Sequence, residues 1–195
     1  MISIFRSFLP WIIFSILYGS TRNSFVMASL VALGYLVIFE WKDLKEKMIF
    51  TWVTLCYFLM TLFLSYIFTS NWIEVNSSIL SNFALMCIAF GSLIAKVPFT
   101  IQYARRTVEP QKWKHPLFIE INNILTAMWG VLFLLALITN ITYSFTSELN
   151  HNAYLILTNF IWIIGAIVSK WFPSYWRKRN YEQNHPIKKS KKSIS

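Results

Sequence analysis

Neutral amides and hydroxyls are the side chains within the apolar stretches of this chain that could carry chemistry. Asn82 and Asn159 are predicted at comparable depth in the outer parts of two different stretches, where they could hydrogen-bond to each other. Asn122, Thr126 and Gly130 recur every four residues and therefore share one face of a helix. Such faces either line a polar path, or bind their own helix carbonyls and hold neighbouring helices together. The second interpretation is favoured, and the polar path stays open as a hypothesis.

Ionisable groups avoid the middle of every apolar stretch. Most acidic residues are expected at or near the cytoplasmic face, namely Glu40, Asp43, Glu46, Glu109 and Glu120. Glu74 and Glu148 are expected in outer loops. Because proton and ion relays place such groups within the spans, this distribution weighs against a proton-coupled pump.

The spacings typical of metal, nucleotide and nucleophile sites do not occur in this sequence. The His residues show no ligand spacing, and five glycines leave little room for a phosphate-binding loop. Cys56 and Cys87 lie within apolar stretches and are interpreted as small apolar residues. We therefore assign no catalytic residue, no cofactor and no metal site, and we favour a protein without enzymatic activity.

Six apolar stretches must position these groups. They are Phe8–Ser20, Phe25–Phe39, Met48–Thr69, Ile79–Ala95, Leu117–Ile138 and Ala153–Trp171. The loops at residues 70–78 and 139–152 contain no Lys or Arg, whereas the other two long connections and the C-terminal tail are rich in both. Basic loops stay in the cytoplasm during insertion, so both termini are predicted to be cytoplasmic. Arg22 alone falls on the wrong side.

Composition supports this membrane assignment. The chain is 56% hydrophobic and 13% charged, which excludes an ordinary soluble globule. The net charge of +10 lies beside apolar spans, so its expected partner is the anionic cytoplasmic leaflet and not nucleic acid. We predict an all-α polytopic transmembrane helical bundle of about six spans over residues 1–174. A basic tail over residues 175–195 is expected to be disordered and cytoplasmic.

The first stretch admits two interpretations. Arg6 followed by apolar residues resembles a secretory signal peptide, with small residues near Gly19. Pro10 and the single early arginine fit an uncleaved anchor better. The first and second stretches are also short against the ~20 residues that cross a bilayer. They could tilt little, thin the bilayer, or form a helical hairpin around Thr21–Ser24.

A short cytoplasmic interfacial helix is predicted between the fourth and fifth spans, within Lys96–Pro116. Its apolar stripe comprises Val97, Ile101, Ala104 and Val108. Arg105 and Arg106 lie off that stripe, where they could hold lipid phosphates or simply enforce the topology.

The end of this segment contains a basic-His-Pro-x-aromatic element, Lys114-His115-Pro116-Leu117-Phe118. It resembles an element of isoprenylcysteine methyltransferase-like membrane enzymes, which also carry an acidic pair on a following helix. Here the following segment offers only Glu148 in an outer loop. We therefore interpret the element as a helix start.

A longer resemblance covers Lys96–Phe133. It is carried by Pro98-Phe99-Thr100, Gln102-Tyr103-Ala104-Arg105, Trp113, Pro116, Phe118, Asn122, Thr126 and Trp129-Gly130. This segment is similar to small uncharacterised bacterial inner-membrane proteins, and loosely to the intracellular septation protein A group. The resemblance implies a bacterial inner-membrane location and a cell-envelope role, without catalytic residues to transfer.

Three functional hypotheses follow from the sequence. The first is a non-enzymatic envelope protein that works through lipid contacts or an envelope protein partner. The second is a small transporter or channel, in which loss of Asn82 or Asn159 would abolish flux. The third is a lipid-modifying enzyme, in which His115 would be essential for turnover.

Overall fold

The computed structural model describes residues 6–19, 21–68, 71–145 and 151–184, with the side chains of residues 151–153, 155, 159 and 182–184 left out. Within these residues the chain is helical and has no strand. The long helices are α3 (Arg22–Phe39), α5 (Ile49–Ile67), α7 (Ser77–Ile94), α9 (Pro116–Phe145) and α10 (His151–Asn184). The short ones are α2 (Leu9–Leu17), α4 (Trp41–Lys45), α6 (Trp72–Val75), α8 (Phe99–Ala104) and the 3₁₀ turn η1 (Pro110–Lys112).

Five helices of the described chain are long and apolar enough to cross a membrane, namely α3, α5, α7, α9 and α10. The first predicted span is different, because α2 has nine residues and rises only about 14 Å. Pro10 lies in its first turn, and the backbone at Tyr18 is extended, so the helix is confined between these points. α2 packs along α3 as a hairpin. The sixth span thus stays a prediction.

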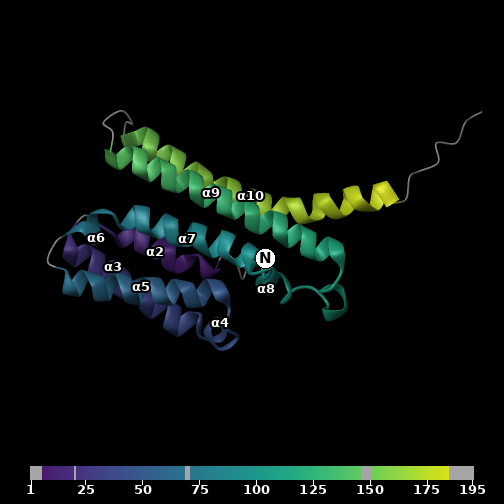
Figure 1. The fold of residues 1–195 in the computed structure, drawn as a ribbon, viewed down its shortest axis with the longest axis horizontal. Coiled ribbons are helices and arrows are strands. Elements are labelled where there is room, and N and C mark those ends of the chain that lie inside the picture. Colours follow the sequence, from purple (N-terminus) through teal and green to yellow (C-terminus); the bar gives the residue numbers. More distant parts are fainter. Residues whose placement is uncertain (1–5, 20, 69–70, 146–150, 185–195) are drawn as a thin grey trace, which may run out of the picture.

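The long helices lie roughly parallel to one another in stacked layers (Figure 1). α9 and α10 form one layer, α7 packs along α9, and the pair of α2 and α3 reaches α7 through α5. α10 changes direction along its length and contains Pro173, whose missing N–H interrupts the helical hydrogen-bond ladder. It continues to Asn184, past the domain boundary that we predict at residue 174, and residues 185–195 lie outside the described chain.

Aromatic side chains join the layers. Phe8 lies 4.8 Å from Trp129 and 5.6 Å from Trp162, between ring centroids, and so connects the N-terminal segment to α9 and α10. Trp129 is 1% exposed and donates its indole N–H to Ser169 at 3.0 Å. Glycine lets the helices approach at this point, because a Cβ on Gly165 would lie 2.6 Å from the Trp129 ring.

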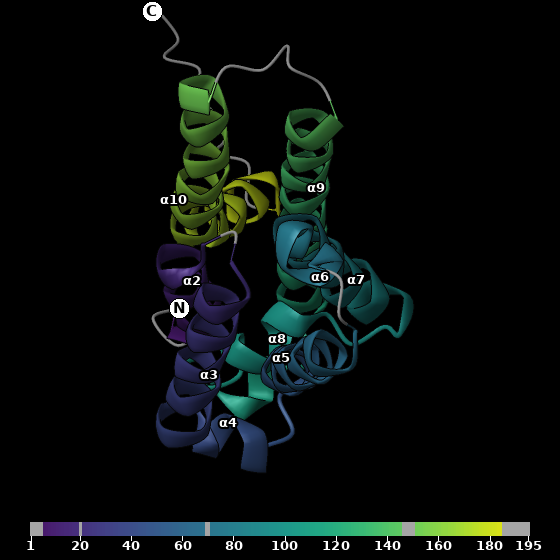
Figure 2. The same cartoon turned by 90° about the vertical axis from the view of Figure 1, so that its left-hand side faces the viewer.

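α8 is largely buried within the bundle, and the interfacial helix predicted within Lys96–Pro116 stays a prediction. α8 spans six residues, and Phe99, Thr100 and Tyr103 are all buried. The chain reverses at Lys96, whose φ is 57°, and the Phe99 amide then donates to Ser92 Oγ at 3.1 Å. Because this turn folds α8 back against α9, the helix packs against protein on several sides. In the end-on view it lies between α5 and α9 (Figure 2).

Candidate functional site

A cavity of about 530 Å³ lies between α8, α9 and α10. One part of its wall is apolar, and comprises Val108, Leu117, Phe118, Ile121, Leu125 and Pro173. Hydroxyl and amide groups come from Thr100, Tyr103, Asn122 and Ser169, and basic groups from Lys112, His115 and Arg177. A cavity that combines an apolar wall with several basic groups suits a ligand with an apolar body and a negative end.

Local hydrogen bonds hold the walls of this cavity. Thr100 on α8 donates to the Asn122 carbonyl at 3.0 Å, and its hydroxyl lies 2.8 Å from that of Thr126. At the start of α9, the Leu117 amide donates to His115 Nδ1 at 3.2 Å, which satisfies one of the free amides of the first turn. The His115 ring is therefore oriented by the helix start.

The two predicted lipid-phosphate contacts behave differently. Arg106 donates to Asp43 Oδ1 at 2.8 Å and to Glu46 Oε2 at 2.6 Å, so carboxylates engage its guanidinium. Arg105 is exposed and lies over the Trp113 ring at 5.3 Å. Neither residue lines the cavity, so a headgroup contact at these arginines stays a prediction.

The residues of the predicted polar path are scattered. Asn122 and Asn82 donate to carbonyls of their own helices, Asn122 to Phe118 at 2.8 Å and Asn82 to Ser78 at 2.9 Å. The Asn159 side chain lies outside the described residues, so its pairing with Asn82 stays a prediction. Among the members of this group whose side chains are described, Asn122 is the one that lines the cavity between α8, α9 and α10.

Sequence reasoning missed a buried pair of carboxyl groups at the same end of the bundle. Glu40 is 2% exposed and Asp43 is 6% exposed. The Ser7 hydroxyl donates to Glu40 at 3.1 Å and lies 3.4 Å from Asp43 Oδ2, so the two carboxyl groups are close neighbours. Arg6 Nε lies 2.8 Å from Glu40 Oε1. The three-residue spacing of Glu40 and Asp43 at the start of a helical turn was the available signal, since it places both on one face.

The electrostatics of this carboxyl pair favour a bound proton. Burial, a hydrogen bond with Asp43 and the charge of Asp43 raise the pKa of Glu40 to about 7, against the opposing effects of Arg6 and Ser7. On α8, burial raises the pKa of Tyr103 to about 12, so its phenol stays protonated. Two carboxyl groups that share a site cannot both ionise easily, because each charge opposes the other.

A second buried carboxylate lies at the opposite end of α5. Glu74 is fully buried, accepts a hydrogen bond from Ser65, and lies 3.1 Å from Arg22 Nε. Although burial opposes ionisation, these hydrogen bonds and the Arg22 charge hold the pKa of Glu74 below its usual value. This ion pair accounts for the arginine on the wrong side of the predicted topology, because Glu74 neutralises it.

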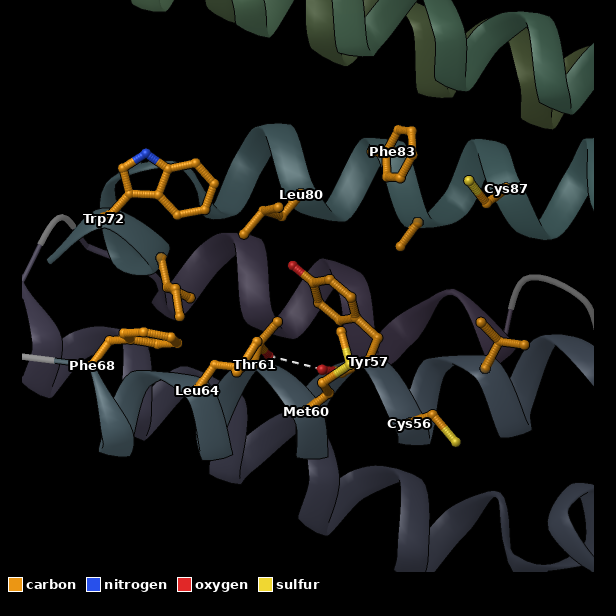
Figure 3. Close-up of a pocket in the computed structure, with 13 residues that line it drawn as sticks. Cys56, Tyr57, Met60, Thr61, Leu64, Phe68, Trp72, Leu80, Phe83 and Cys87 are labelled. Atoms are coloured by element: carbon orange, nitrogen blue, oxygen red, sulfur yellow. Dashed lines mark hydrogen bonds between the residues drawn. The ribbon is translucent and has the colours of Figure 1, made fainter. Parts of the chain in front are cut away.

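A further cavity of about 720 Å³ separates α5 from α7 (Figure 3). Its wall is almost entirely apolar, with Leu64, Phe68, Leu80 and Phe83 among the lining side chains. The Thr61 hydroxyl donates to the carbonyl of Tyr57 in its own helix at 2.9 Å. This cavity therefore offers little to orient a polar ligand.

Within the described residues, no group of three or more His, Cys, Asp or Glu side chains could hold a metal ion. The polar sites that we assign are the cavity between α8, α9 and α10, the Glu40–Asp43 carboxyl pair, and the ion pair of Glu74 with Arg22. No protein-family model, no curated protein and no solved structure matches this chain.

Proposed function

We propose that this chain is an integral membrane protein that binds an anionic lipid in the cavity between α8, α9 and α10. In this proposal it serves the cell envelope of a bacterium from the inner membrane, without catalysing a reaction. Both termini would face the cytoplasm. The resemblance of Lys96–Phe133 to bacterial envelope proteins supports the location.

The lining of the cavity carries the proposal. Lys112 and Arg177 come from segments far apart in the sequence and line the same cavity. Lys112 Nζ also lies 2.9 Å from Glu109 Oε2, in an exposed ion pair that contributes little and that a headgroup phosphate can replace. Their charges suit a phosphate or another anionic headgroup, and the apolar side chains of α9 suit the start of an acyl chain. A free inorganic anion would leave that apolar wall unused, so the proposal commits to a lipid.

The position of the cavity agrees with this ligand. It lies at the end of the bundle that carries the basic connections, and the positive-inside rule assigns this end to the cytoplasm. Anionic lipids attract basic groups at that leaflet by roughly 1 kcal/mol for each Lys or Arg. Two basic residues in the cavity therefore correspond to a preference for anionic over neutral lipid of about 30-fold.

Native mass spectrometry tests the proposal. The protein in a non-ionic detergent is titrated with dioleoyl phosphatidylglycerol and, separately, with dioleoyl phosphatidylcholine. We expect one tightly bound phosphatidylglycerol, and about 30-fold weaker binding after Lys112→Gln together with Arg177→Gln. Lys114→Gln together with Arg179→Gln is the matched control, since it removes two positive charges from the same two segments outside the cavity lining. An equal loss of phosphatidylglycerol affinity in the test variant and in the control would contradict a specific site.

A further inference from the structure

We propose that the Glu40–Asp43 carboxyl pair is a proton-binding site, and that its proton strengthens lipid binding in the cavity on the other side of α8. The first half of this inference stands on the carboxyl pair alone. The second half rests on the proposed function. The two halves are therefore tested by separate measurements.

The two carboxyl groups of the pair are buried side by side, an arrangement that favours one bound proton. Glu40 and Asp43 are both almost fully buried, and one Ser7 hydroxyl lies within 3.4 Å of both carboxyl groups. Glu40 Oε1 is buried and receives no hydrogen bond within the described chain, although Arg6 lies beside it. Arg6 therefore compensates the charge of this oxygen without a well-aligned hydrogen bond, and a proton on the pair removes one of two adjacent buried charges.

The pair has two positive partners, one of which it shares with a third carboxylate. Several elements contribute titratable or polar groups to this cluster: Arg6, Ser7, Tyr35, Lys42, Glu46, Thr51, Tyr103 and Arg106. Glu40 and Asp43 each have one guanidinium partner, Arg6 and Arg106, and Arg106 is shared with the exposed Glu46, which Lys42 also approaches at 3.8 Å. A proton on the pair relieves the repulsion between two carboxylates that lie side by side.

α8 connects this cluster to the cavity. The hydroxyl of Tyr103 lies 3.3 Å from that of Thr51 beside the carboxyl pair, and Tyr103 also lines the cavity. Arg106, which follows α8, holds Asp43. When the pair takes up a proton, the charge next to α8 becomes more positive by one unit, so an anionic ligand binds more tightly. By linkage, bound anionic lipid then raises the proton affinity of the pair equally.

The proton site is tested first and without lipid titration. Infrared difference spectra of the protein in phosphatidylcholine nanodiscs, recorded from about pH 8 to about pH 6, report the C=O stretch of protonated carboxyl groups. We expect a band that appears near neutral pH, vanishes in Glu40→Gln, and persists in the control Glu120→Gln, which changes an exposed carboxylate. The same band in Glu40→Gln would overturn the site.

A measurement on the unsubstituted protein covers the case in which Glu40→Gln does not fold. Solid-state NMR of the chain labelled with ¹³C-glutamate follows every Glu carboxyl carbon during a pH titration. One Glu should titrate near neutral pH, well above the ordinary range for exposed carboxyl groups. If every Glu titrates in the ordinary acidic range, the proton site does not exist.

The coupling is tested by the phosphatidylglycerol affinity as a function of pH. Imidazoles change charge over the same interval, so all variants carry His115→Gln. We expect affinity to rise about fivefold from about pH 8 to about pH 6, the lower end of typical coupling between sites. Glu40→Gln should bind tightly at both values, and Glu120→Gln should keep the pH dependence.

The outcomes separate the two proposals. A phosphatidylglycerol affinity that does not change with pH, together with a Glu that titrates near neutral pH, would overturn the coupling and leave the proton site. Absence of specific phosphatidylglycerol binding at either pH would overturn the proposed function and, with it, the coupling. The infrared and NMR titrations decide the proton site in every case.

Discussion

Replacing Gly165 with alanine should destabilise the contact between α9 and α10, and the structure shows why. The added Cβ would lie 2.6 Å from Trp129 Cη2 and 2.7 Å from Cζ3. Carbon atoms pack best at about 3.5–4.0 Å, so the ring or the helix must move by about 1 Å. The Trp129 ring is held on several sides, since it is 1% exposed, stacks on Phe133 and donates to Ser169.

The magnitude combines two opposing effects. Overpacking a well-packed core costs about 1–3 kcal/mol, and moving Trp129 also weakens its hydrogen bond to Ser169, which is worth about 1 kcal/mol. Alanine in place of glycine stabilises a helix by about 0.5–1 kcal/mol. We therefore expect a net loss of about 2 kcal/mol in the free energy of unfolding.

Gly91 provides the matched control, because a Cβ at this helical position meets nothing within 4 Å. Gly91→Ala should therefore raise stability by about 0.5–1 kcal/mol. Unfolding in mixed micelles with increasing SDS, followed by tryptophan fluorescence and circular dichroism, measures both variants. Trp129→Phe removes the ring atoms in the clash, so Gly165→Ala should cost at least about 0.5 kcal/mol less in that background. Equal stability of Gly165→Ala and Gly91→Ala would refute the reasoning.

Three further predictions concern the turn at Lys96 and the buried charges. Lys96 has a left-handed φ of 57°, which glycine adopts without the steric penalty of a Cβ. Lys96→Gly should therefore raise the free energy of unfolding by up to about 1 kcal/mol in the same SDS titration, whereas Lys96→Ala should not. Arg22→Gln leaves Glu74 charged and fully buried, so it should lower the free energy of unfolding by about 3 kcal/mol at neutral pH. The loss should be smaller in acid, where Glu74 is protonated, and equal losses at both pH values would contradict this ion pair. Because the pKa of Glu40 is raised to about 7, its contribution to stability is complete below its unfolded pKa and is lost as pH rises through about 7. Thermal unfolding should show this decline, and Glu40→Gln should lack it.

The sequence by itself determined the all-helical, strongly apolar character of the protein and the positions of most of its helices. Long apolar runs bounded by polar loops predict helices wherever they occur, because only a helix satisfies its own backbone in lipid. Five of the six predicted stretches correspond to helices long and apolar enough to cross. Pro116, predicted at a helix start, begins α9. These features depend on composition and local spacing, which a sequence displays directly.

Tertiary structure alone decided which polar groups are buried. Arg6 and Glu40 are far apart in the chain, and the packing of α2 along α3 brings them into contact. Asp43 on α4 and Arg106 after α8 are likewise distant in sequence and meet only in the folded chain. Near the ends of spans an acidic residue resembles a solvated one in sequence, so the burial of Glu74 was not predicted. The cavity likewise needs Lys112 and Arg177 from distant segments. Burial and charge pairing are properties of side chains gathered in space, whereas a linear pattern records only spacing along one helix.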